Sequence, residues 1–224
     1  MAWRSSGASN TALVNNLAQN GLIKSERVKE AMLKIDRAHF APSHPYEDSP
    51  QPIGHRATIS APHMHASACE SLLPYLNPGA RVLDIGCGSG YLTAVLAALV
   101  GPTGSVIGID HIQPLVSLSL SNLQKSGDGR AMLDSGQVRF VKGDGRRGFG
   151  EGAPYDAVHV GAAAAEHHEE LTRQLKSPGR LFVPVAEGYG QYIFVVDKKE
   201  DGSVERKKLY GVQYVPLTDA PEGE

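Results

Sequence analysis

The stretch that decides the fold reads Val82-Leu83-Asp84-Ile85-Gly86-Cys87-Gly88-Ser89-Gly90-Tyr91. Its first half is the apolar run of a short buried strand, and an apolar helical pattern begins at Tyr91 and continues to Val100. The glycines between them allow positive φ angles and let a ligand approach the backbone closely. The first turn of the helix offers free backbone amides. We therefore expect a strand, a ligand-binding loop and a helix, and the alternative is a glycine turn without a ligand.

Strand and helix patterns alternate on both sides of this stretch. Runs rich in Val, Ile and Leu predict strands over 105–110, 138–142, 155–160 and 180–185, and helices are predicted over 65–75, 113–124 and 166–175. Such alternation is typical of a mostly parallel sheet that is covered on both faces. Residues 191–197 and 207–215 flank the hairpin signal Asp201-Gly202, so we expect antiparallel edge strands there.

The first 62 residues are more polar and more interrupted. Ser9 or Asn10 can cap one short helix, and Ser25 can cap a second. Residues 39–62 contain five prolines and show no regular period. A segment this long is expected to be a lid or a substrate-binding loop, and the alternative is a solvated connector.

Composition limits the class of protein. The chain has 224 residues, with 22 Lys plus Arg and 24 Asp plus Glu, which gives a formal net charge of −2. This length suits a single domain over 1–224, with an N-terminal part over 1–62, a strand–helix core over 63–186 and C-terminal strands over 187–224. The near-neutral charge argues against binding to nucleic acid or to an anionic membrane. No apolar run reaches the roughly 18 residues of a membrane span, and the start shows no signal-peptide core.

The cysteines and histidines bear on the cellular location and on metal binding. Two cysteines, Cys69 and Cys87, cannot form a disulfide scaffold, which favours a reducing, cytoplasmic location in the cytosol. The pairs His63–His65 and His167–His168 suggest metal ligands, but no third ligand is suitably spaced. We therefore expect no metal site. No heptad pattern is present, and this favours a monomer.

Three acidic residues stand where predicted strands end, and they indicate a nucleoside ligand. Asp110 lies 20 residues after Gly90, where an acidic residue in doubly wound sheets binds the hydroxyls of an adenosine ribose. Asp84 and Asp144 follow the same pattern on two other strands. Because ligands bind outside the carboxyl ends of such strands, we expect the three carboxylates to surround one crevice.

The glycine spacing distinguishes between two cofactors. Gly86, Gly88 and Gly90 follow the pattern G-x-G-x-G, whereas the dinucleotide fingerprint is G-x-G-x-x-G. The carboxylate of Asp84, two residues before the loop, would repel a pyrophosphate but can accept a hydrogen bond from a ligand ammonium. S-adenosylmethionine carries a ribose and an ammonium group but no phosphate. The loop therefore favours this cofactor over NAD.

Several further segments are more specific than the glycine loop. They are DSPQPIG (48–54), ATISAPHMH (57–65), VIGIDH (106–111), GDG (143–145), PYDAVHVGAAA (154–164) and YVPLTD (214–219). With these segments the chain resembles the protein-L-isoaspartate (D-aspartate) O-methyltransferase family over nearly its whole length. Residues 220–224 form an acidic end that departs from the family pattern.

The resemblance implies both a fold and an activity. The fold would be the Rossmann-like α/β fold of class I S-adenosylmethionine-dependent methyltransferases, with a seven-stranded, mostly parallel sheet and added N-terminal helices. The activity would be methyl transfer from S-adenosylmethionine to the free carboxylate of L-isoaspartyl and D-aspartyl residues in damaged proteins and peptides. S-adenosyl-L-homocysteine would be released, and the ester would start repair through a succinimide.

The resemblance also implies site residues. Ser60 would be the active-site residue that orients the carboxylate, although without the resemblance it could be a serine that only turns a proline-rich loop. The cofactor shell would contain Ile59, Ala61, Pro62, His65, Ser89, Asp110, His111, Gly143, Asp144 and Thr218, besides the loop residues Asp84, Gly86, Gly88 and Gly90.

Two other functions remain open at this point. One is a class I methyltransferase for a small molecule or RNA; amino-group methylases carry an (Asp/Asn)-Pro-Pro-aromatic motif where this chain has Asp156-Ala157-Val158-His159. The other is a non-catalytic nucleoside sensor of the same fold. The polar segment 53–64 argues against the sensor, because a sensor needs no second polar site.

Overall fold

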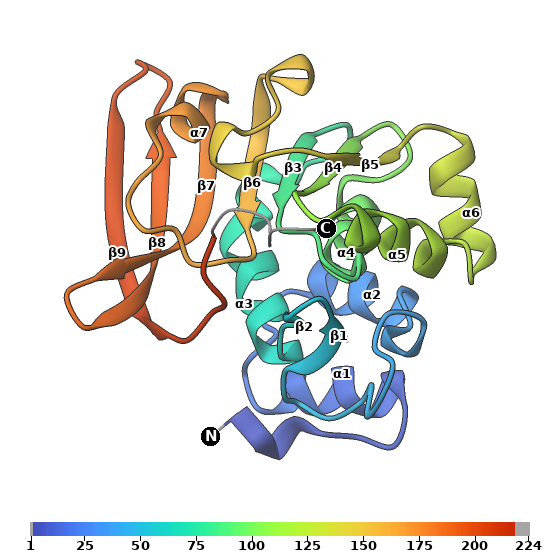
Figure 1. The fold of residues 1–224 in the computed structure, drawn as a ribbon. Coiled ribbons are helices and arrows are strands. Elements are labelled where there is room, and N and C mark those ends of the chain that lie inside the picture. Colours follow the sequence, from blue (N-terminus) through green and yellow to red (C-terminus); the bar gives the residue numbers. More distant parts are fainter. Residues whose placement is uncertain (1, 218–224) are drawn as a thin grey trace.

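The computed structural model describes residues 2–217, and seven of its strands form one twisted sheet (Figure 1). The strands are β3 (Arg81–Ile85), β4 (Ser105–Asp110), β5 (Val138–Lys142), β6 (Tyr155–Val160), β7 (Leu175–Glu187), β8 (Gly190–Lys198) and β9 (Val204–Val212). Their order across the sheet is β5-β4-β3-β6-β7-β8-β9. All pairs from β5 to β7 are parallel, and β8 and β9 are antiparallel. The predicted mostly parallel sheet with antiparallel edge strands is confirmed.

The described part of the chain contains seven α-helices. They are α1 (Asn10–Gln19), α2 (Glu26–Lys34), α3 (Pro62–Leu72), α4 (Tyr91–Val100), α5 (Gln113–Leu123), α6 (Gly127–Asp134) and α7 (Glu169–Arg173). Of these, α4 and α5 begin where the sequence predicts. Ser9 caps α1, because its Oγ accepts a hydrogen bond from the amide of Ala12 at 3.1 Å. Ser25 holds the same position before α2, but its side chain makes no capping bond.

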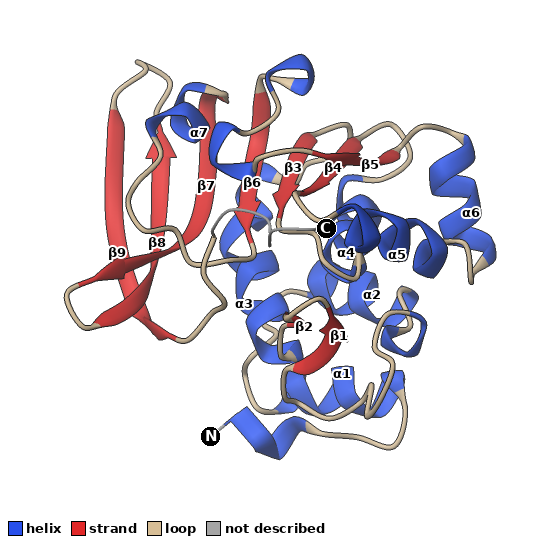
Figure 2. Cartoon of the chain, viewed as in Figure 1, coloured by secondary structure: helices blue, strands red, loops and turns tan. Residues whose placement is uncertain are grey.

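Alternate residues of the strands point to opposite faces of the sheet and build two cores. Val82 and Val106 pack with helices α1 to α5 in the larger core. Leu83 and Ile107 pack on the other face with Leu171 of α7. Figure 2 shows α4, α5 and α6 in the half of the molecule that contains β3, β4 and β5. No helix in the described part of the chain is long and apolar enough to cross a membrane.

Three elements differ from the sequence-based expectation. Helix α6 is not predicted. The helix predicted over 166–175 is shorter in the structure, where it is α7, because Leu175 already pairs with Tyr155 as the start of β7. Within the segment 39–62, β1 (Gln51–Gly54) and β2 (Ala57–Ile59) form a separate antiparallel hairpin. Part of the segment that was expected to be a loop is therefore a β-hairpin.

The chain after β9 returns to the carboxyl ends of the parallel strands. The amide of Ala163, after β6, donates to the carbonyl of Val215 at 2.8 Å, and the amide of Leu217 donates to the carbonyl of Ala163 at 2.7 Å. The β1–β2 hairpin approaches the same edge of the sheet from the N-terminal part (Figure 1). Two segments far apart in sequence thus enclose the end of β3.

Candidate active site

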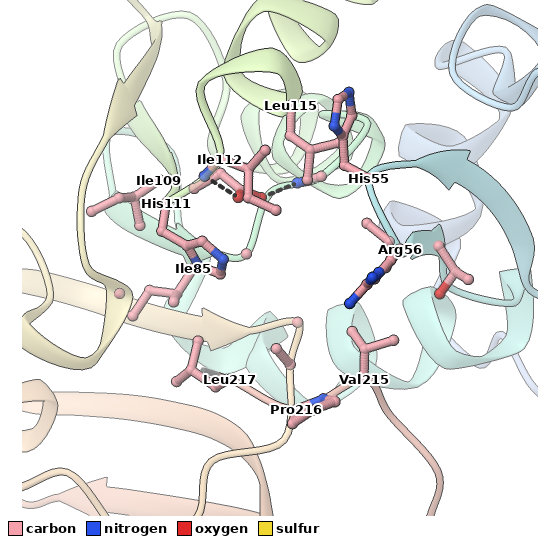
Figure 3. Close-up of a pocket in the computed structure, with 18 residues that line it drawn as sticks. His55, Arg56, Ile85, Ile109, His111, Ile112, Leu115, Val215, Pro216 and Leu217 are labelled. Atoms are coloured by element: carbon pink, nitrogen blue, oxygen red, sulfur yellow. Dashed lines mark hydrogen bonds between the residues drawn. The ribbon is translucent and has the colours of Figure 1, made fainter. Parts of the chain in front are cut away.

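A cavity of about 380 Å³ lies at the carboxyl ends of β3 and β4 (Figure 3). At this point the strand order changes direction, because β4 and β6 lie on opposite sides of β3. This is where doubly wound sheets bind ligands. The walls are mainly apolar and come from Ile85, Ile109, Ile112, Leu115, Ala162, Val215, Pro216 and Leu217. Arg56 and His111 lie on opposite sides of the cavity (Figure 3).

The glycine loop has the conformation that its sequence predicts. Gly86, Gly88 and Gly90 have φ angles of +70°, +52° and +82°, a region that L side chains rarely adopt. A Cβ on Gly90 would also lie 3.0 Å from the ring of Phe140. The first turn of the loop is tied to β4, since the amides of Gly86 and Cys87 both donate to the carbonyl of Ile109.

Asp110 joins the loop to the cavity. Its carboxylate accepts hydrogen bonds from the amides of Gly88 and Ile112, both at 3.1 Å. The side chain is buried yet still lines the cavity, and burial raises the pKa of Asp110 above its ordinary value. Asp110 is therefore placed both to hold the loop and to accept hydrogen bonds from a ligand.

Asp84 is more enclosed than its sequence position suggests. One carboxylate oxygen accepts a hydrogen bond from Thr93 Oγ1 at 2.6 Å, and the other lies 2.8 Å from His159 Nδ1. Asp84 does not line the 380 Å³ cavity; it lines a small adjoining pocket of about 30 Å³. Only the remaining lone pairs of this carboxylate can receive a ligand.

Asp144 differs from the expectation of three carboxylates around one crevice. Its carboxylate forms a bidentate ion pair with Arg146, with both N–O distances at 2.9 Å, and this pair lowers the pKa of Asp144. Asp144 lines neither the large cavity nor the small pocket, whereas the neighbouring Gly145 lines the large one. The crevice itself is therefore lined by the carboxylates of Asp110 and, through its small pocket, Asp84.

A second cavity of about 630 Å³ contains Ser60. It is lined by the start of α3, by the end of β9 with Tyr210, and by the segment that follows β9 with Tyr214. Thr58 and Gly161 line this cavity, the 380 Å³ cavity and the small pocket alike, and Ser60 lines both the second cavity and the small pocket. The small pocket is therefore the place where the two larger cavities meet.

Two residues, Arg37 and Tyr214, lie beside Ser60. The buried guanidinium of Arg37 donates from Nη2 to the carbonyl of Ser60 at 2.9 Å. On the cavity side, the phenol of Tyr214 lines the same cavity as Ser60 and is close enough to affect it electrostatically, and burial raises the pKa of that phenol. The side chain of Gln191 fixes the backbone of Tyr214 through bonds of 2.6 and 3.2 Å. The bond from Arg37 fixes the Ser60 backbone, and Tyr214 is held beside the Ser60 hydroxyl in the same cavity.

Most predicted site residues come together at this edge of the sheet. The residues that line one or more of the three spaces are Ile59, Ser60, Ala61, His65, Asp84, Gly86, Gly88, Ser89, Asp110 and His111. Pro62, Gly90 and Asp144 lie outside the linings, but each is adjacent in sequence to a lining residue. Gly143 also lies outside, and its amide donates to the carbonyl of Asp110 at 3.0 Å. Thr218 lies outside the described residues.

The two members of the H-x-H pair have separate partners. His63 Nδ1 lies 2.8 Å from the carboxylate of the buried Asp48, while His65 contacts Arg37. Among the described residues, no group of three histidine, cysteine or acidic side chains is arranged to hold a metal ion.

Sequence reasoning missed Arg37 and assigned no role to Tyr214. A single arginine in a polar segment has no pattern that marks it as buried. Tyr214 belongs to the diagnostic segment 214–219, so the resemblance could have directed attention to it. The apolar wall residues Ile112 and Leu115 were predicted only as members of a helix or its flank.

Comparisons with known proteins identify one family of similar sequences. The family model for protein-L-isoaspartate(D-aspartate) O-methyltransferase matches residues 8–222. A protein-L-isoaspartate O-methyltransferase of Caenorhabditis elegans is 48% identical over 222 residues, covering 99% of this chain and 98% of the relative. Another from Triticum aestivum is 50% identical over 211 residues, covering 93% and 91%.

A solved structure extends the likeness to three dimensions. It is a Plasmodium falciparum protein, provisionally described as a protein-L-isoaspartate O-methyltransferase, in complex with S-adenosyl-L-homocysteine. The TM-score is 0.88 at 33% identity, and the match covers 95% of this chain and 99% of the other. From the family match, the two close relatives and this fold, it follows that the chain belongs to the protein-L-isoaspartate (D-aspartate) O-methyltransferase family.

Proposed function

We propose that the cavity at Asp110 holds S-adenosylmethionine and that the cavity at Ser60 holds the isoaspartyl residue of a damaged protein. The enzyme methylates the free carboxylate of that residue and so starts repair through a succinimide. The observation that carries the assignment of the two cavities is their meeting point. Thr58 and Gly161 line both, and Ser60 lines the small pocket between them.

The residues at the first cavity fit this cofactor. Asp110 offers a carboxylate to ribose hydroxyls, and Ile112, Leu115 and Leu217 supply apolar surface for an adenine ring. Asp84 and Asp110 place two carboxylates beside the glycine loop, which suits a cationic ligand and disfavours a pyrophosphate. When bound, S-adenosylmethionine supplies a methyl group on a positively charged sulfur, which is activated for transfer to an oxygen nucleophile.

The residues of the second cavity have a limited chemical task. The acceptor carboxylate is already ionised at neutral pH, so no general base is needed. The hydroxyl of Ser60 can donate a hydrogen bond to that carboxylate and orient it, while Arg37 holds the Ser60 backbone and Tyr214 lies beside the hydroxyl. Orientation of this kind contributes on the order of 7–11 kcal/mol in well-aligned reactions.

A pair of peptides tests the function. The peptides share one sequence and differ only in an isoaspartyl or a normal aspartyl residue at one position. We expect the purified protein to transfer radiolabelled methyl groups from S-adenosylmethionine to the isoaspartyl peptide alone, as a base-labile ester. Equal labelling of both peptides, or labelling of neither, would contradict the function.

Finer assignments follow from the family resemblance and are part of the proposal. Gly143, Asp144 and Thr218 would complete the cofactor shell, and D-aspartyl residues would also be substrates. The near-neutral net charge and the lack of a heptad pattern support an enzyme that acts as a monomer. The free, buried thiols of Cys69 and Cys87 support a cytosolic location.

The N-terminal helices and the sheet share one hydrophobic core, and this supports a single domain over 1–224.

A further inference from the structure

Arg37 is an unusual residue for its position, because its side chain is fully buried behind the Ser60 segment. It lies in the 3-10 turn Arg37–His39, and its guanidinium lies over the ring of Tyr91 at 5.3 Å. Nη2 donates to the carbonyl of Ser60 at 2.9 Å, and Nη1 lies 3.4 Å from Nδ1 of His65. Burial lowers the pKa of Arg37 to about 10, so the group remains a cation at neutral pH.

The contact with Arg37 determines which ring nitrogen of His65 carries the proton. A guanidinium has donors and no acceptor, so Nδ1 of His65 accepts this hydrogen bond and the ring proton is on Nε2. The ring is also neutral, because burial and the nearby charge of Arg37 lower the pKa of His65 well below its ordinary value. The other titratable groups that face it are His63 on α3, His159 on β6 and Tyr91 on α4.

The remaining polar group of His65 is the Nε2–H. Among the described residues no hydrogen-bond partner is found for this atom. It is also not one of the fully buried polar atoms that lack a partner, so a ligand can reach it. The space that His65 lines is the small pocket between the two larger cavities, together with Ser60, Asp84 and His159. A neutral N–H donor is thus available where the two reactants meet.

We propose that Arg37 is a positioning residue that holds His65 as a neutral Nε2–H donor for a carboxylate oxygen of the reactants. The proposal rests on the proposed function, since that function places two carboxylates near the pocket: the methionine carboxylate of the cofactor and the acceptor carboxylate of the peptide. Neutrality has a clear purpose here. An imidazolium in the small pocket would repel the positive sulfur of the methyl donor, whereas a neutral N–H can bind a carboxylate without that repulsion.

The tautomer can be observed without any turnover. We expect nitrogen NMR of the wild-type protein, labelled with ¹⁵N-histidine, to show for His65 a pyridine-like Nδ1 and a pyrrole-like Nε2 that do not titrate between pH 6 and 8. In Arg37→Met, which removes donors and charge, the ring should populate both tautomers. A proton on Nδ1, or an imidazolium at pH 7, in the wild-type protein would overturn the proposal even if Arg37→Met does not fold.

Two variants of His65 then test the donor. In His65→Asn the side-chain amide ends near the position of Nδ1, so it can still face Arg37 but offers nothing at Nε2. In His65→Gln the amide reaches the Nε2 position and keeps a donor there. We expect His65→Asn to lower the affinity for the ligand that carries this carboxylate about 10–100-fold, as for a lost hydrogen bond to a charged group. His65→Gln should keep most of the wild-type affinity.

Two measurements on these variants identify the carboxylate. Calorimetry compares S-adenosyl-L-homocysteine with methylthioadenosine, which has the same nucleoside but no amino-acid carboxylate. Weaker binding of the first ligand alone assigns the donor to the cofactor carboxylate, and a higher KM for the isoaspartyl peptide with unchanged cofactor affinity assigns it to the acceptor. If His65→Asn changes neither, the proposal is wrong. Failure of the wild-type protein to methylate the peptide would contradict the proposed function and leave the NMR result standing.

Discussion

Replacing Asp110 with asparagine tests how the site holds the cofactor. The carboxylate of Asp110 accepts one backbone hydrogen bond on each oxygen, from Gly88 and from Ile112. Asparagine keeps one oxygen and turns an NH₂ group towards the other backbone donor, so one charge-assisted bond is lost in the unliganded protein. Bonds of this kind contribute about 1.5–3 kcal/mol. A ribose hydroxyl bound by the same group would lose a comparable amount.

The two losses can be measured separately. The backbone bond contributes to the free energy of unfolding without ligand, which urea titration measures. The ribose bond contributes to the affinity for S-adenosyl-L-homocysteine, which calorimetry should show to fall about 10–150-fold, equivalent to about 1.5–3 kcal/mol.

Asp156→Asn is the matched control, since Asp156 also accepts a backbone amide, that of Arg81 at 2.7 Å, but lines neither the two cavities nor the small pocket. We expect this variant to change the affinity far less than Asp110→Asn does. If Asp110→Asn binds as tightly as the wild-type protein, or no more weakly than Asp156→Asn, the ribose role of Asp110 is refuted.

Three other predictions follow from the same structure. Ser60→Ala should lower kcat on the isoaspartyl peptide at least about tenfold while calorimetry finds cofactor affinity within about twofold, because the role proposed for Ser60 is to orient the acceptor. A collapse of cofactor affinity would contradict this proposed role. Because the pKa of His65 is lower in the folded than in the unfolded state, the unfolding free energy should fall as pH drops below about 6.5, by up to about 1.4 kcal/mol per pH unit. Urea titrations at pH 7, 6 and 5 should show a weaker dependence in His65→Gln, and an unchanged slope would count against the assignment. Burial raises the pKa of Cys69 and Cys87, so both thiols should react with a thiol reagent only after denaturant is added, and rapid reaction in the native protein would contradict their burial.

The central strands and the glycine loop could be predicted because local sequence determines them. The bounds predicted for β4, β5 and β6 agree with the structure, and β3 is the buried strand expected before the glycine loop, as buried runs of Val, Ile and Leu permit few alternatives. The positive φ angles of the loop glycines are ones that this residue type permits, as expected from the sequence.

Helix α6 was missed because its own sequence argues against a helix. It begins at Gly127 and contains Gly129, and glycine is a poor helix former. The structure supplies the reason for the second glycine, because a Cβ on Gly129 would lie 1.9 Å from the carbonyl oxygen of Leu123. Close packing at the end of α5 therefore overrides helix propensity.

Within the site, sequence could place side chains but could not predict their partners. Asp84 was correctly located at the end of a strand, yet nothing local indicates that Thr93 and His159 contact its carboxylate. The contact of Arg37 with Ser60 joins residues 23 positions apart through the packing of separate elements. Such long-range contacts depend on the folded chain, and so does the neutral state of His65.

The most direct test of the two-cavity arrangement is a crystal structure with S-adenosyl-L-homocysteine and an isoaspartyl peptide bound together. We predict the nucleoside at Asp110, the isoaspartyl carboxylate within hydrogen-bond distance of Ser60 Oγ, and the cofactor sulfur at the small pocket lined by Thr58 and Gly161. A peptide carboxylate bound away from Ser60, or a nucleoside outside the Asp110 cavity, would contradict the account.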